Sequence, residues 1–551
     1  MGRPAEAVRA DARPQGERPL RFITAASLFD GHDAAINIMR RIIQAQGVEV
    51  VHLGHNRSVE DVVRAALQEN ADGIAISSYQ GGHMEYFRYM VDMLKERGAA
   101  HIRVFGGGGG TITPEEIAEL HDYGVERIYH PNDGMHMGLV HMIEDVVARA
   151  AHARDSGLGT GDSQTPASVD VTDENSVGRM LSALEDDVFS ESELKMLRKQ
   201  WAGGSSQSPV PSPQSRPATP VVGLTGTGGA GKSSVVDELL LRFLHAFPEM
   251  RIAVLAVDPT RRRSGGALLG DRIRMNALRS HRVYMRSMAT RRAHAATSKV
   301  LHDCIDFLKS QPYDLVIVET AGIGQSDSEI VDLVDFPMYV MTSDYGAASQ
   351  LEKIDMIDFA ELIVLNKYDR RGAEDALRDV KKQWKRNRTK FELKDDEVPV
   401  YPTIASQFND PGVTWMFANL CRLLREKIPG VGDEKCNFEP QLDVSVKEPR
   451  ATVLIPGKRV RYLAEIAEQG RGINADIERQ AEAASKAQNC YEALKELDDP
   501  QLPAELALYK ATDLHPSPAG RGTEGEGAGG SDVTKGSDPH PNPSPEGRGA
   551  Q

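Results

Sequence analysis

Short apolar runs alternate with amphipathic stretches along most of the chain. In the first third, apolar runs predict five strands, and a 3.6-residue periodicity predicts a helix after each of them. The predicted strands span 21–26, 48–54, 73–78, 101–106 and 127–130, and the predicted helices span 34–46, 58–70, 83–97, 114–121 and 138–149. Such alternation is typical of a parallel α/β sandwich, which we expect at residues 20–152.

A second α/β block is predicted at residues 220–432. Its clearest strands are 221–225, 252–257, 315–319, 337–342 and 362–366. The linker, 153–219, is rich in Gly, Ser and Pro, but residues 177–201 have the spacing of one amphipathic helix. The apolar positions of that helix are Met180, Leu181, Leu184, Val188, Leu194 and Leu197.

Three further segments complete the chain. Residues 433–512 are expected to form a helical linker or dimerisation segment. Residues 1–19 and 513–551 are rich in Gly, Pro and polar residues, and we expect both to be disordered.

The composition argues against several classes of protein. A net charge of -15 disfavours a nucleic-acid partner, because phosphate contacts need clustered Lys and Arg. No run of about 18 apolar residues occurs, so neither a transmembrane helix nor a membrane partner is expected. The 4 cysteines are widely spaced, which disfavours a zinc ribbon. Residues 1–20 lack an apolar signal segment, so we predict a cytoplasmic protein.

The second block opens with a phosphate-binding motif. Its first strand runs into GTGGAGKS at 226–233, which is GxxxxGK[ST] in a strand–loop–helix setting. Glycines let backbone N–H groups approach phosphate oxygens at the positive end of a helix. Lys232 is expected to reach the β and γ phosphates and Ser233 to hold Mg²⁺. The predicted nucleotide-binding residues of this loop are Gly228, Gly229, Ala230, Gly231, Lys232 and Ser233.

A guanine-reading motif follows the strand that ends at residue 366. Asn366, Lys367 and Asp369 form the NKxD motif of GTPases. The Asp369 carboxylate can accept hydrogen bonds from both N1 and N2 of guanine, which adenine does not offer in that arrangement. We therefore predict GTP as the nucleotide, with residues 404–406 as a weaker candidate for contact with the base.

Three further segments carry a family resemblance. The sequence ETAG at 319–322 has Glu where ordinary GTPases have Asp, and it is accompanied by AVLAVDPT at 253–260 and GGALLGDRIRM at 265–275. Together they resemble the metallochaperone-type GTPases that serve cobalamin enzymes. The resemblance implies that Asp258, Asp271 and Glu319 gather around Mg²⁺, which prefers oxygen ligands.

The same resemblance suggests the roles of neighbouring residues. Val257 and Thr320 are weaker candidates for the Mg²⁺ site, and Lys232 and Glu319 are the expected catalytic residues. Arg274, one helical turn after Asp271, is a candidate nucleotide contact. Segments 321–326 and 344–352 are expected to act as switches.

The first block carries a second set of motifs. Asp30, Gly31 and His32 follow its first strand, Ser77 follows its third, and Gly106 and Gly107 follow its fourth. The spacing resembles the cobalamin-binding signature DxHxxG…SxL…GG, with Ala35 in place of Gly and Tyr79 in place of Leu. The resemblance implies a flavodoxin-like, Rossmann-type domain. In it, His32 is the lower axial cobalt ligand and Asp30 orients its ring. Ser77, Gly106 and Gly107 would hold the displaced benzimidazole tail.

General physical arguments support this interpretation. In a sheet of order 2-1-3-4-5, ligands bind at the carboxyl ends of the strands, where the first and third strands flank the switch point. A metal-bound histidine needs an acceptor for its other ring N–H, and Asp30 suits that role. A lone histidine among the 16 in the chain is usually exposed or hydrogen-bonded in a core. Without Asp30, Ser77 and the glycine pair, His32 would therefore not be expected to bind a metal.

A cobalamin domain, a linker helix and a chaperone-type GTPase in this order resemble the fused isobutyryl-CoA mutases over roughly residues 20–510. The resemblance implies that adenosylcobalamin serves a radical interconversion of isobutyryl-CoA and butyryl-CoA, while GTP hydrolysis gates cofactor loading and protection. In that family a substrate-binding barrel follows the segment matched here at 455–497. A barrel needs at least about 200 residues, so we expect this chain to lack it and to have no isomerase activity alone.

The expected partners are a separate acyl-CoA mutase subunit that carries the barrel and an adenosyltransferase that delivers the cofactor. A homo-oligomer is also expected. The sequence leaves open whether the chain is a subunit of a split mutase or a truncated reading frame, and whether the substrate is an isobutyryl or a methylmalonyl thioester. Two other functions stay open, namely a cobalamin-dependent sensor and a metal-insertion GTPase for another enzyme. A metal-insertion GTPase usually carries His-rich or paired-Cys metal sites, and the sequence shows neither.

Overall fold

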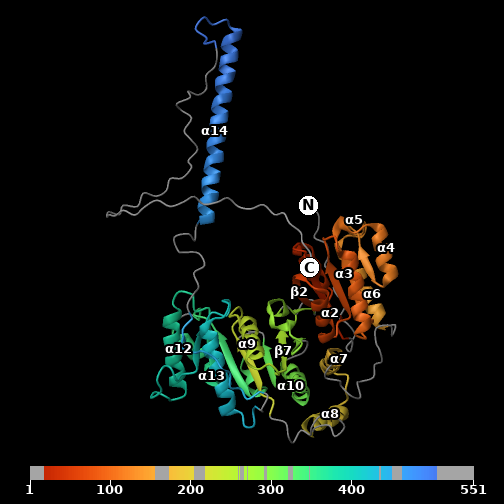
Figure 1. Cartoon of the computed structure of the whole chain (residues 1–551), viewed down its shortest axis with the longest axis vertical. Coiled ribbons are helices and arrows are strands. Elements are labelled where there is room, and N and C mark those ends of the chain that lie inside the picture. The colour runs from red at the N-terminus through yellow and green to blue at the C-terminus, as the bar shows by residue number, and fades with distance from the viewer. Residues whose placement is uncertain are drawn as a thin grey trace, which may run out of the picture. The chain divides into compact units, whose positions relative to one another are not determined.

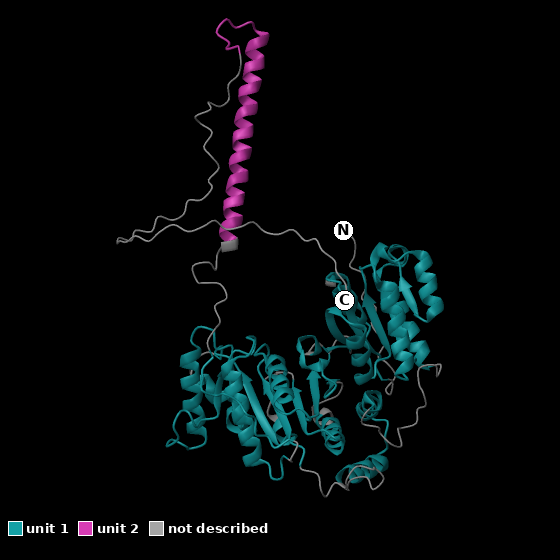
Figure 2. Cartoon of the chain, viewed as in Figure 1, with its two compact units in different colours: residues 1–452 teal, residues 453–551 magenta. Residues whose placement is uncertain are grey.

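The computed structural model describes residues 18–155, 173–203, 218–258, 260, 266–269, 271–290, 294–320, 327–345, 348–432, 436–449 and 462–504. The predicted switch 321–326, the predicted tail 513–551 and nearly all of the predicted disordered N-terminus lie outside these ranges. The chain divides into two units, residues 1–452 and 453–551, which Figure 2 shows in different colours. All of the predicted site residues fall in the first unit.

The first sheet is parallel, with the order β5-β4-β3-β1-β2-β8. Its first five strands have the predicted order 2-1-3-4-5, but the sixth comes from the second α/β block and is not foreseen by the sequence. The strands are β1 (Arg21–Ser27), β2 (Glu49–Arg57), β3 (Gly73–Ser77), β4 (Arg103–Gly107), β5 (Arg127–Tyr129) and β8 (Ala267–Leu269).

Helices cover both faces of this sheet (Figure 1). On one face, α2 (Val59–Gln68), α3 (His83–Glu96) and α4 (Pro114–Tyr123) bury their apolar sides. On the other face, α1 (Asp33–Ala45) and α6 (Leu139–Asp155) pack together. A short helix that the periodicity does not predict, α5 (Pro131–Met137), precedes α6 and ends at Gly138, whose φ of 78° breaks the helical path.

The linker contains two helices, so the prediction of one helix over 177–201 is wrong. α7 (Glu174–Glu185) ends before Asp187, which has a φ of 57°, and α8 (Glu191–Gly203) then begins. The physical reason is a capping box, because the Ser190 hydroxyl accepts from the Glu193 N–H while the Glu193 carboxylate accepts from the Ser190 N–H. Val188, one of the predicted apolar positions, lies between the helices and is 64% exposed.

The second sheet is also parallel, with the order β13-β12-β11-β6-β10-β7-β9. Helices α9 (Lys232–Ala246) and α13 (Pro411–Lys427) pack on one face, and α10 (His294–Ser310), α11 (Met356–Phe359) and α12 (Ala373–Asn387) pack on the other. The strands are β6 (Val221–Gly226), β7 (Ile252–Asp258), β9 (Val283–Ala289), β10 (Leu315–Thr320), β11 (Phe336–Met341), β12 (Leu362–Asn366) and β13 (Val400–Thr403). The predicted α/β fold class is therefore confirmed, with β9 and β13 in addition to the predicted strands.

The segment 433–512 is only partly helical. Residues 436–449 contain no helix, and Cys436 and Phe438 are buried in the core beneath the second sheet, so the compact part of the chain extends past residue 432. The long helix α14 (Tyr462–Glu496) belongs to the other unit. Among the described residues, no helix is both long and apolar enough to cross a membrane.

Candidate cofactor and nucleotide sites

His32 and Asp30 form a close pair after β1. Nδ1 of His32 lies 2.9 Å from Oδ1 of Asp30, which also accepts the His32 backbone N–H at 2.8 Å. The carboxylate is buried, whereas the imidazole is 76% exposed. A carboxylate at Nδ1 holds the proton on that nitrogen, so Nε2 presents its lone pair toward solvent. This is the arrangement that a metal-binding histidine requires.

Tyr79 completes the support of this pair. Its backbone N–H donates to Oδ2 of Asp30 at 2.7 Å, and its ring centroid lies 5.5 Å from that of His32. The sequence identifies Tyr79 only as a departure from the usual Leu. In the structure the larger ring packs against the imidazole, so this departure adds a contact to the histidine.

An apolar cavity of about 380 Å³ opens beside the pair. One side includes the backbone of the glycine run that begins at the end of β4, and the other is formed by α1, α5 and α6, with Ala35 among the lining residues. A flat aromatic group such as benzimidazole would be expected to favour such a surface. Six of the residues around the cavity are Ile36, Met39, Ser77, Gly106, Gly107 and Met142.

The glycines at this cavity have two different structural reasons. A Cβ on Gly106 would lie 2.4 Å from Phe87, so this glycine is required by the core beneath the sheet. A Cβ on Gly108 would lie 1.9 Å from the carbonyl oxygen of Ser78, so the run must continue past Gly107. The sequence predicts Gly106 and Gly107 as ligand contacts, and both line the cavity through their backbone.

Ser77 is one of the polar residues that line this cavity. Its Oγ is buried and has no hydrogen-bond partner among the residues that the structure describes. Buried hydroxyls almost always have a partner, so an unpaired one facing a cavity fits a ligand that supplies an acceptor or donor. The described residues at this site therefore fit a cobalamin with its nucleotide tail in the cavity.

Replacing Ser77 with alanine is expected to weaken cobalamin binding by about 2- to 10-fold, because one hydrogen bond to the ligand is lost. The measurement is a spectroscopic titration of the purified chain. Ser78→Ala is the matched control, since the Ser78 hydroxyl already accepts from Ser27 at 2.9 Å. Equal losses of affinity in both variants would contradict a direct role for Ser77.

The phosphate loop lies between β6 and α9. Gly231, at the start of α9, has a φ of 95°, a conformation that favours glycine. Lys232 is buried, and its Nζ donates to the carbonyl oxygens of Gly226 at 3.0 Å and Thr227 at 3.4 Å. The ammonium group is therefore held over the loop in which the phosphates are predicted to lie.

The predicted base-reading motif is joined to this loop. Nδ2 of Asn366 donates to the Ala230 carbonyl at 2.8 Å, and Nζ of Lys367 donates to the Gly229 carbonyl at 2.7 Å. The Ala405 N–H donates to Oδ1 of Asn366 at 3.0 Å, which places the weakly predicted segment 404–406 beside the motif. Asp369 is exposed in the turn that follows β12, as a residue that reads a base must be.

The predicted Mg²⁺ residues are brought together in part. The Ser233 hydroxyl donates to Oε1 of Glu319 at 2.8 Å, which joins the phosphate loop to the end of β10. Thr320 is opposite Val257 in the sheet, so Asp258 lies next to this end of β10. The side chain of Asp271 is outside the described set. Within that set, no group of three or more His, Cys, Asp or Glu is arranged to hold a metal ion.

Arg274, the predicted nucleotide contact, is exposed at the end of η3 (Asp271–Arg274).

Two family descriptions match the chain. Residues 20–131 match "B12 binding domain", and residues 213–420 match "Methylmalonyl Co-A mutase-associated GTPase MeaB". The two matches confirm a cobalamin-binding domain followed by a GTPase domain of this kind, which we call the cobalamin domain and the GTPase domain.

Relatives named "Fused isobutyryl-CoA mutase" match most of the chain. The one from Geobacillus kaustophilus is 49% identical over 480 residues, covering 87% of this chain and 43% of the relative. The one from Cupriavidus metallidurans is 50% identical over 470 residues, covering 85% and 41%. The chain therefore spans less than half the length of these relatives. These comparisons confirm the resemblance: the chain is a homologue of fused isobutyryl-CoA mutases that contains a B12-binding domain and a MeaB-type GTPase domain.

Proposed function

We propose that this chain binds adenosylcobalamin through His32 and hydrolyses GTP with Mg²⁺ to control loading of that cofactor into an acyl-CoA mutase. The observation that carries the proposal is the exposed His32 imidazole, held by buried Asp30 beside an apolar cavity. That cavity is lined by Ser77, whose hydroxyl has no partner among the residues described by the structure. The homologues, which are named as isobutyryl-CoA mutases, support an isobutyryl thioester as the substrate class.

Each part of the chain has a separate task in this function. Adenosylcobalamin supplies the radical chemistry of the rearrangement when it is bound. His32, Asp30 and the cavity bind the cofactor and orient it. Lys232, Ser233 and Glu319 bind the phosphates and Mg²⁺, with Asp258 and Asp271 as further Mg²⁺ ligands, and Asp369 selects guanine. The proposed partners are a mutase barrel, an adenosyltransferase that delivers the cofactor and a second copy of this chain.

The test is reconstitution with a mutase barrel supplied as a separate chain. Adenosylcobalamin, Mg²⁺, GTP and isobutyryl-CoA are added, and formation of butyryl-CoA is followed by chromatography. Turnover that requires both chains supports the proposal. Absence of GTP hydrolysis and of a histidine-ligated cobalamin spectrum in the purified chain would overturn it.

A further inference from the structure

A segment of the GTPase domain is built into the sheet of the cobalamin domain. We call it the docked segment, and it comprises residues 266–269 and 271–274. Its strand β8 pairs in parallel with β2, with Ala267 opposite Glu49 and Leu269 opposite Val51. Ala267 and Leu269 are fully buried in the same core as α2 and α3. The docked segment is therefore structurally part of the cobalamin domain.

Close backbone contact fixes the start of the docked segment. A Cβ on Gly266 would lie 2.3 Å from the carbonyl oxygen of Gln44, at the end of α1. Backbone atoms cannot move aside as the end of a flexible side chain can, so only glycine permits this approach. The glycine that precedes ALLGD in the sequence thus has a docking role.

Arg272 fixes the other end of the docked segment. Its buried guanidinium donates to Oε1 of Gln68 and, at 3.2 Å, to the carbonyl oxygen of Met285. Its Nε lies 3.4 Å from Oε1 of Glu69. Gln68 and Glu69 are at the end of α2, in the cobalamin domain. Burial lowers the pKa of Arg272, and the neighbouring Glu69 carboxylate opposes that shift.

Glu69 is itself held by several groups. It accepts the Ser287 N–H at 3.0 Å and the Ser287 hydroxyl at 2.8 Å, both from β9. Arg21 of β1 lies 3.5 Å from the same carboxylate. Removing one partner from a buried charge pair is strongly unfavourable, so these contacts hold the end of α2 and Arg272 in one arrangement.

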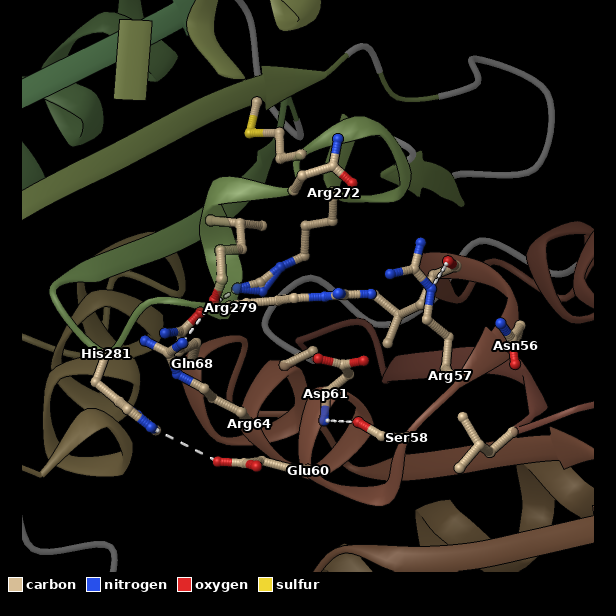
Figure 3. A pocket seen from close by; sticks show the side chains of 16 residues that line it. Asn56, Arg57, Ser58, Glu60, Asp61, Arg64, Gln68, Arg272, Arg279 and His281 are labelled. Atoms are coloured by element: carbon tan, nitrogen blue, oxygen red, sulfur yellow. Dashed lines mark hydrogen bonds and ion pairs between the residues drawn. The ribbon is translucent and has the colours of Figure 1, made fainter. Parts of the chain in front are cut away.

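A second arginine joins the same helix to the GTPase domain. Arg64 of α2 donates to the carbonyl oxygens of Leu278 at 2.6 Å and Val283 at 2.8 Å. Arg64, Gln68 and Arg272 line a pocket of about 440 Å³ between the two domains, and Figure 3 shows their side chains directed toward one another. The helix α2 therefore contacts the GTPase domain through Arg64 and Gln68, one turn apart.

We infer that Gln68 and Glu69 of the cobalamin domain are positioning residues for GTP hydrolysis. They hold Arg272, and Arg272 is adjacent in sequence to Asp271, so the Cα atoms of these two residues are about 3.8 Å apart. The inference rests on the proposed function, in which Asp271 is a Mg²⁺ ligand. Through the side chains of Gln68 and Glu69, the cobalamin domain thereby sets the Mg²⁺ affinity of the nucleotide site.

The test uses Gln68→Ala and Glu69→Gln in the full chain. Each is expected to raise by about 2- to 30-fold the Mg²⁺ concentration needed for half-maximal binding of a fluorescent GTP analogue, which is the range for substitutions that act on a site through packed neighbours. Binding of GDP without Mg²⁺ should stay unchanged. Because Glu69→Gln alters a buried charge, thermal unfolding and cobalamin titration establish that each variant is folded, and Gln68→Ala is the milder change.

Glu60→Gln is the matched control. Glu60 is also on α2 and pairs with His281 of the GTPase domain at 3.7 Å, but both side chains are exposed, so its loss should not alter Mg²⁺ dependence. Folded Gln68→Ala protein with the Mg²⁺ dependence of the wild type would overturn the inference alone. A wild-type chain that binds no GTP would overturn the proposed function and, with it, the inference.

Discussion

Replacing Lys232 with alanine is expected to lower the rate of GTP hydrolysis by about 100-fold or more, in line with the loss of one donor aimed at developing charge. The carbonyls of Gly226 and Thr227 hold Lys232 over the phosphate loop, so its side chain needs little reordering before it contacts a phosphate. The measurement is steady-state release of phosphate from GTP with Mg²⁺ present.

Cobalamin binding in the same variant should remain at the wild-type level, because His32 and the apolar cavity belong to the other domain. Lys199→Ala is the control, since Lys199 is an exposed lysine on α8. Comparable loss of hydrolysis in both lysine variants would argue that general charge, and not Lys232, supports the reaction. Retention of more than half of the rate in Lys232→Ala would contradict the assigned role.

Replacing His32 with alanine is expected to abolish the histidine-ligated cobalamin spectrum and to weaken binding by more than about 10-fold. The reasoning is that altering even a partner of a metal-bound histidine costs 10- to 100-fold, so loss of the ligand itself should cost at least as much. Asp30→Asn should keep the ligand but weaken binding by about 10-fold, because the carboxylate no longer orients the ring. Both effects are measured by absorption spectroscopy during titration.

His55→Ala is the matched control for these variants. His55 is an exposed histidine on β2, and the proposed cobalamin site does not include it. GTP hydrolysis should be unchanged in all three variants when no cofactor is present. An unaltered ligand spectrum in His32→Ala would show that another group binds cobalt.

Much of the fold could be predicted from the sequence because local patterns determine it. Apolar runs with helices between them indicate parallel sheets, and the predicted order 2-1-3-4-5 is found in the first five strands. The helix break at 186–190 could also have been predicted from the sequence, because Ser190 and Glu193 have the spacing of a capping box. The strand β8 was not, since three residues carry too little pattern of their own.

The site residues show the same division. Motif spacing predicts His32, Ser77 and Lys232 as site residues, because binding of cobalt and phosphate demands particular residue types at loop ends. Tyr79 and Gly108 were recognisable only as irregularities in a motif, and their packing against His32 and Ser78 depends on how separate loops meet.

The sequence by itself determined the two α/β blocks, their order and the residue types at both sites, because these depend on neighbours along the chain. Only the tertiary structure decided that the docked segment, residues 266–269 and 271–274, packs on the cobalamin domain, where Gly266 meets Gln44 and Arg272 meets Gln68. The physical reason is that these contacts join residues some 200 positions apart, and close backbone approach and buried charge pairing leave no periodic signal in the chain.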